Sequence, residues 1–96
     1  NQALALGLSP ADKLSALQHR GIARLKLQAY SQAVSDFNQA IKLDPRQGDA
    51  YYHRGRARAA QQDYFRAAED FSEALGLNPD QPLIHYDRGR AYAGQG

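Results

Sequence analysis

Three histidines are the residues of this chain whose side chains are best suited to bind a metal ion or to transfer a proton. His19, His53 and His85 lie 34 and 32 residues apart, and the sequence has no cysteine and no His-x-x-x-His pair. Zinc ligands normally come at short helical spacings or in Cys pairs, because they must converge on one ion. We therefore expect three surface imidazoles, no metal and no other cofactor.

The signatures of the common catalytic sites do not occur in the sequence. It contains no Gly-rich phosphate loop, no Gly-x-Ser-x-Gly nucleophile elbow and no carboxylate pair at catalytic spacing. We therefore expect that the chain is not an enzyme.

Arginine supplies a second kind of chemistry, which is the recognition of acidic groups. Arg54, Arg56 and Arg58 form one group, and Arg88 and Arg90 form another. The formal net charge is only +2, with acidic and basic residues interspersed. Such a balance does not indicate a nucleic-acid partner, although the arginines keep an RNA-binding helical repeat among the alternatives.

The elements that must position these side chains are helical. The chain has 96 residues, is 43% hydrophobic, and contains many alanines but a single valine. This composition favours one modest domain of closely packed helices. It has no membrane segment and no secretory signal pattern, so cytoplasmic is the default localisation, which is otherwise unknown.

The chain repeats itself with a period of 34 residues. Residues 14–47 align with 48–81 at fifteen identical positions, and the tripeptide His-Arg-Gly at 19–21 recurs at 53–55. A third copy begins at Pro82. A fixed period of this length indicates an array of stacked supersecondary units.

Each repeat predicts two helices. The first helices are expected over 14–27 and 48–61, with the first of them starting near Pro10 because Ser9 is a good N-cap. The second helices carry an apolar stripe at helical spacing and end before Pro45 and Pro79. A mid-helix glycine in each first helix indicates close approach of the second helix.

These units resemble the tetratricopeptide repeat family. The matching residues are Gly21, Ala33, Phe37, Ala40 and Pro45 in one unit, and Gly55, Ala67, Phe71, Ala74 and Pro79 in the next. The resemblance implies an all-α fold, a right-handed α-solenoid of stacked antiparallel helix pairs. One domain would cover residues 1–96: the tail of a preceding helix and a connection (1–13), repeat 1 (14–47), repeat 2 (48–81) and the first helix of a truncated repeat 3 (82–96). We expect a segment of a longer array.

The resemblance also implies that the first helices line a concave groove and that the function is a protein–protein interaction scaffold. The groove would bind a peptide or protein segment. The candidate groove residues are Gln18, His19, Ile22, Tyr52, His53, Arg56, Tyr86, Asp87 and Arg90. Tyrosine and arginine are common anchors of interfaces, so an acidic and apolar segment is the expected ligand. The alternative is an inner face that is merely solvated.

Two other functions compete with this one. In this family, basic and Asn side chains hold the C-terminal carboxylate of chaperone tails; here the matching positions carry Gln18, Ile22, His53, Leu83 and Asp87, which disfavours that ligand. A self-association module that forms homo-oligomers through exposed terminal helices is the alternative function, with Ala91 and Tyr92 on the exposed flank of the last helix.

The arginine before each glycine has two interpretations. Arg20, Arg54 and Arg88 would form a ladder of cationic ligand contacts, or they have a structural role, which the pattern favours. Arg20 and Arg54 recur in register with Asp36 and Asp70, which suggests an ion pair between the two helix types. The sequence allows pairing within a unit, or between units, where Arg88 would reach back to Asp70.

Overall fold

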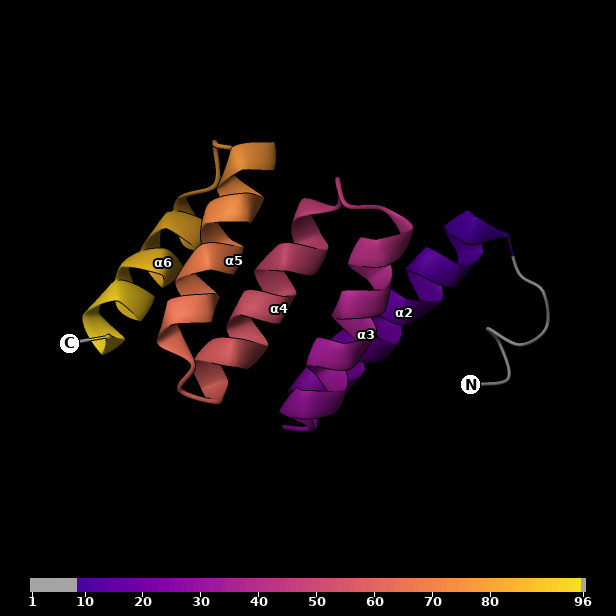
Figure 1. The fold of residues 1–96 in the computed structure, drawn as a ribbon, viewed down its shortest axis with the longest axis horizontal. Coiled ribbons are helices and arrows are strands. Elements are labelled where there is room, and N and C mark those ends of the chain that lie inside the picture. The colour runs from indigo at the N-terminus through magenta and orange to yellow at the C-terminus, as the bar shows by residue number, and fades with distance from the viewer. Residues whose placement is uncertain (1–8, 96) are drawn as a thin grey trace.

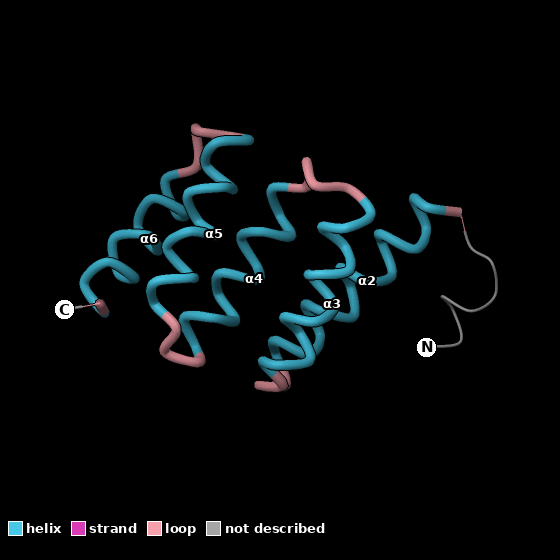
Figure 2. Tube along the Cα trace, in the orientation of Figure 1, coloured by secondary structure: helices cyan, strands magenta, loops and turns pink. Residues whose placement is uncertain are grey.

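The computed structural model describes residues 9–95, which form five helices. They are α2 (Pro10–Lys26), α3 (Tyr30–Leu43), α4 (Gly48–Ala60), α5 (Tyr64–Leu77) and α6 (Pro82–Gly94). Figures 1 and 2 show the helices arranged in chain order, with α2 and α3 at one end of the molecule and α6 at the other. The all-α antiparallel pairs are confirmed. The helix tail expected within residues 1–8 lies outside the described residues.

Helix ends form where the sequence supplies caps or stops. The Ser9 hydroxyl accepts a hydrogen bond from the amide of Asp12, and Pro10 occupies the first helical position. Helices α3 and α5 end with extended backbone at Asp44 and Asn78, each just before a proline. These ends agree with the prediction, because a residue that precedes proline is disfavoured in the helical region.

The turns inside the two pairs share one backbone geometry. Gln28 and Gln62, which are 34 residues apart, have φ angles of 63° and 66°. This left-handed region is the usual conformation one residue beyond a helix C-cap, where glycine is preferred. The repeat therefore preserves the turn without a glycine.

The two helices of each pair approach closely at a glycine. A Cβ atom placed on Gly21 would lie 2.7 Å from the ring of Phe37, and one placed on Gly55 would lie 2.7 Å from the ring of Phe71. Both distances are shorter than side chains tolerate, so the phenylalanine rings occupy space that only glycine leaves free. This confirms the close approach predicted from the sequence.

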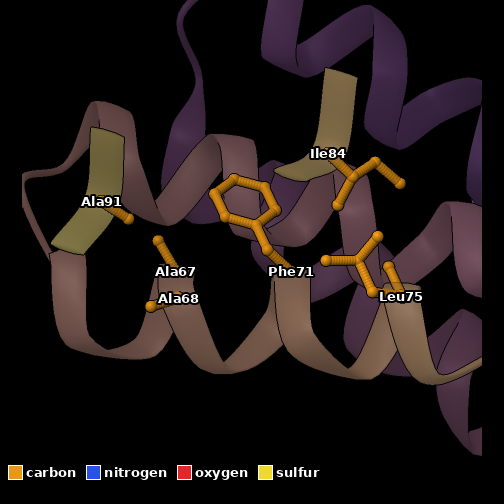
Figure 3. Close-up of a cluster of buried hydrophobic side chains, with 7 residues drawn as sticks. Ala67, Ala68, Phe71, Leu75, Ile84 and Ala91 are labelled. Carbon is orange, nitrogen blue, oxygen red and sulfur yellow. The ribbon is translucent and has the colours of Figure 1, made fainter. Parts of the chain in front are cut away.

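Small side chains let the pairs stack. Phe71 packs against Ala67, Ala68 and Leu75 of its own helix and against Ile84 and Ala91 of α6 (Figure 3). Ala91 is only 2% exposed. The prediction that Ala91 lies on the exposed flank of the last helix is therefore wrong, because its methyl group fills the interface between α5 and α6.

A buried carboxylate holds each pair together. Asp36 accepts hydrogen bonds from Arg20 at 2.7 Å and from Arg24 at 3.0 Å. Asp70 is held in the same way by Arg54 at 2.7 Å and Arg58 at 2.9 Å. The pairing is thus within a unit. Each aspartate binds two arginines, of which the sequence predicted only the one that precedes the glycine.

Contacts between the units use neutral partners. Arg54 donates to the Asn38 side-chain oxygen at 2.9 Å, and Arg88 donates to the Ser72 hydroxyl at 3.3 Å. Arg54 and Arg88 therefore each touch the preceding unit.

Candidate functional site

A groove lies between α4 and α6, with α5 at its base, and has a volume of about 340 Å³. The lining residues are Arg56, Ala59, Ala60, Tyr64, Phe71, Asp87, Arg90, Ala91 and Gly94. Side chains of α5 form its floor, and residues of the two first helices form its walls. We call this surface the α4–α6 groove.

Two arginines carry the positive charge of the groove. The Arg56 guanidinium lies 5.8 Å from the centre of the Tyr52 ring, and that of Arg90 lies 5.9 Å from the centre of the Tyr86 ring. Both arginines are exposed. Each guanidinium is thus placed beside an aromatic face without being neutralised, so its donors remain available to a carboxylate.

One carboxylate, that of Asp87, lines the same groove as these arginines. Asp87 accepts a 2.9 Å hydrogen bond from the Tyr52 hydroxyl. Burial of Tyr52, followed by the Asp87 hydrogen bond and the Asp87 charge, raises the pKa of this phenol to about 12. The bond therefore persists across the neutral pH range, and it fixes α6 relative to α4.

His53 is half-buried beside Tyr52. Its ring stacks on Phe37 with 5.7 Å between centroids and lies 5.3 Å from the Tyr52 ring. Burial, and then the charge of Arg56, lower the pKa of its imidazole. The surface imidazole expected here is wrong for His53, because the repeat places it between two aromatic rings; His19 and His85 are exposed.

The structure brings together six of the nine candidate groove residues. Tyr52, His53 and Arg56 come from one face of α4, and Tyr86, Asp87 and Arg90 come from α6. Arg56, Asp87 and Arg90 line the groove itself, and the two tyrosines and the histidine support them.

The three candidates on α2 do not join this cluster. Ile22 packs against the core of the first pair, and His19 is exposed. The Gln18 amide nitrogen is buried and has no hydrogen-bond partner among the described residues. Their place in a binding surface remains a prediction.

Sequence reasoning missed the floor of the groove. Tyr64 and Phe71 belong to the apolar stripe of a second helix, yet both also line the groove. One feature of the sequence could have predicted this floor. Lys26, Ala60 and Gly94 share a repeat position, and the side chain at that position becomes smaller from unit to unit. A Cβ on Gly94 would lie 2.7 Å from the Tyr64 ring, so the loss of the side chain gives that ring its place.

Residues 9–95 contain no group of three His, Cys, Asp or Glu side chains that could hold a metal ion. None of their helices combines the length and apolar character that a membrane crossing requires.

These features define the class: a helical-repeat protein whose stacked pairs carry a charged groove with an aromatic floor. The model of the tetratricopeptide repeat family matches residues 20–82 and, again, 54–96. The chain belongs to the tetratricopeptide repeat family. Among curated proteins, none matches it.

Solved structures of this family share the fold. The Arabidopsis OM64 TPR domain is 31% identical over 83% of this chain, with a TM-score of 0.80. The second TPR domain of human RPAP3, in complex with the HSP70 peptide SGPTIEEVD, is 30% identical over 82%, with a TM-score of 0.79. The first TPR of Spaghetti (RPAP3), bound to the HSP90 peptide SRMEEVD, is 26% identical over 91%, with a TM-score of 0.81. This chain spans 66% of the length of each of the three.

Proposed function

We propose that this chain is a non-enzymatic protein–protein interaction module whose α4–α6 groove binds an acidic peptide segment. The observation that carries the proposal is the pair of exposed arginines, Arg56 and Arg90, on the two walls of a groove with an aromatic floor. A carboxylate side chain would bridge the guanidinium groups, and an apolar neighbour would contact Tyr64 and Phe71. The similarity to TPR domains that hold peptides ending in EEVD supports this class of ligand.

The ligand segment is internal and not a free C-terminus. A terminal carboxylate needs several converging cationic or amide donors, whereas Asp87 adds a negative charge to the groove that the two arginines line. The Tyr52 hydroxyl donates one hydrogen bond to the Asp87 carboxylate but does not neutralise its negative charge. A basic or amide side chain in the ligand would pair with it.

The test is a titration of the chain with the peptide SGPTIEEVD in two forms, one with a free C-terminal carboxylate and one amidated. We expect the amidated form to bind at least as tightly, because the proposed contacts use the glutamate side chains. Arg56→Ala and Arg90→Ala should each weaken binding by about tenfold, the loss of one charge-assisted contact. Arg66→Ala is the matched control, since this arginine is 64% exposed on α5 and does not line the groove.

Equal affinity of the wild type and both groove variants would refute the proposal. So would a loss in the Arg66→Ala control as large as that in Arg56→Ala, because it would show that only net charge matters.

A further inference from the structure

Asp87 is a half-buried carboxylate that no cation among the described residues neutralises. It lines the α4–α6 groove, and its hydrogen bond within residues 9–95 comes from the neutral hydroxyl of Tyr52. The ion pairs among these residues all involve other carboxylates. A partly desolvated carboxylate gains most from a cationic partner, because the cation supplies a hydrogen bond and the opposite charge together.

The two arginines of the groove do not act as that partner. Arg56 and Arg90 form no ion pair with any residue in 9–95. Their guanidinium groups lie 5.8 Å and 5.9 Å from the ring centres of Tyr52 and Tyr86. The groove therefore presents charges of both signs, and none of them is paired within the described part of the chain.

These charges follow a fixed order along the helices. Because α4 and α6 are each antiparallel to α5, they run in the same direction (Figure 1). A hydrogen bond joins Tyr52 of α4 to Asp87 of α6, and Arg56 and Arg90 come after these residues on their helices. One turn of an α-helix rises about 5 Å, so the negative charge and the positive pair lie about one turn apart.

We propose that the α4–α6 groove selects an extended segment of a partner protein in which a basic residue lies two positions from an acidic one. Side chains two positions apart in an extended segment point to the same side, about 7 Å from each other, which long side chains can adapt to one helical turn. Asp87 then binds the basic side chain, while Arg56 and Arg90 bind the acidic one. This inference rests on the proposed function and makes Asp87 its specificity-determining residue.

A basic side chain suits Asp87 better than an amide does. The Tyr52 hydroxyl donates to Oδ2 of this carboxylate, and Oδ1 accepts no hydrogen bond from residues 9–95. An amide could donate to Oδ1, but it would leave the negative charge in place near the acidic residue of the ligand. A cation removes this repulsion, so the groove favours a segment with both charges over a purely acidic one.

The test compares three acetylated and amidated peptides, SGPKIEEVD, SGPQIEEVD and KGPSIEEVD, by calorimetric titration of the whole chain. The first has lysine two positions before a glutamate, the second has an amide at that place, and the third has the composition of the first with lysine moved to the far end. We expect SGPKIEEVD to bind about fivefold more tightly than either of the others, the contribution of one partly exposed ion pair. Attraction by net charge alone would favour SGPQIEEVD and would not separate the two lysine peptides.

Asp87→Asn should abolish this preference, because asparagine can still accept the Tyr52 hydrogen bond but carries no charge. Asp80→Asn is the matched control, since Asp80 is exposed in the connection between α5 and α6 and does not line the groove. This control should keep the preference. The comparison of the three peptides on the wild type needs no variant, so it stays decisive if Asp87→Asn does not fold.

Equal binding of the three peptides by the wild type, or tighter binding of SGPQIEEVD, would overturn this inference and leave the proposed function standing. A preference that survives Asp87→Asn would also overturn it, because another residue would then bind the lysine. Absence of binding by all three peptides would overturn the proposed function, and this inference with it.

Discussion

The hydroxyl of Tyr52 and the carboxylate of Asp87 form a 2.9 Å hydrogen bond that ties α4 to α6. Arg56 follows Tyr52 by one turn of α4, and Arg90 follows Asp87 by about one turn of α6. The bond therefore fixes the relative position of the two helix segments that carry Arg56 and Arg90. In this way a contact between repeats positions the candidate ligand contacts.

Removal of this hydroxyl should weaken the contact between the second and third units. We expect Tyr52→Phe to lower the free energy of unfolding by about 1 kcal/mol, the net contribution of one hydrogen bond, and to leave the Asp87 carboxylate with one donor fewer. Urea denaturation measures the change. Tyr51→Phe is the control, because the ring of Tyr51 lies under Arg54 and Tyr52 alone supplies the bond to Asp87. An equal loss in both variants would contradict this role.

The contribution of the same hydroxyl should disappear at high pH. Its pKa is about 12 in the folded chain, against about 10 for an unperturbed phenol. A raised folded pKa means that the stabilisation is complete below the unfolded pKa and is lost as the pH rises through the folded value. The difference in unfolding free energy between the wild type and Tyr52→Phe should shrink from about pH 10 to about pH 12. A difference that stays constant over this range would exclude a proton-dependent contribution.

The buried position of His53 should make the chain less stable at acidic pH. Its folded pKa is lowered, first by burial between Phe37 and Tyr52 and then by the Arg56 charge. The unfolded chain therefore takes up the proton at higher pH, so stability is complete above about pH 6.5 and falls as the pH drops below it. His53→Gln should flatten this decline, and Arg56→Gln should raise the His53 pKa in an NMR titration. His19→Gln, at an exposed histidine, serves as the control.

The sequence predicted the repeat, the ends of the second helices and the close contacts at Gly21 and Gly55, because each depends on residue types that recur at a fixed spacing. It did not predict the left-handed turn at Gln62, since glutamine carries no signature of that conformation. The sequence also did not predict the second arginine that binds Asp70. That contact depends on whether the Arg58 side chain of α4 reaches Asp70 on α5.

The groove was predicted in part for a similar reason. A helical count places Tyr52 and Arg56 on one face of one helix, which needs only the period of the α-helix. Tyr64 of α5 lines the groove only because α4 and α6 leave its ring uncovered. The packing of three helices determines this, so the sequence of one helix does not predict it. The prediction that Ala91 is exposed was wrong for the same reason, because its burial depends on how α6 packs against α5.

Two glycines at the same repeat position should respond to alanine in opposite directions. Gly55→Ala would put a methyl group 2.7 Å from the Phe71 ring and 3.2 Å from the Asp70 Cβ, so we expect a loss of about 2 kcal/mol. At Gly89 the added methyl group would meet no described atom within 4 Å outside its own stretch of helix, so Gly89→Ala should gain about 1 kcal/mol from helix propensity. Thermal or urea unfolding of the two variants provides the comparison. Equal effects would show that backbone propensity, and not packing, explains the glycines.

Replacement of Arg54 separates the framework of the repeat from its binding surface. The guanidinium binds buried Asp70 at 2.7 Å and reaches Asn38 of the preceding unit at 2.9 Å. Arg54→Leu leaves Asp70 with Arg58 alone, so the free energy of unfolding should fall by about 2 kcal/mol, the contribution of a charge-assisted hydrogen bond. The affinity of the folded chain for SGPTIEEVD should not change, because Arg54 does not line the α4–α6 groove. Arg56→Ala should behave in the opposite way, with unchanged stability and weakened binding. If Arg54→Leu weakened binding while leaving stability intact, this arginine would belong to the ligand site and not to the framework.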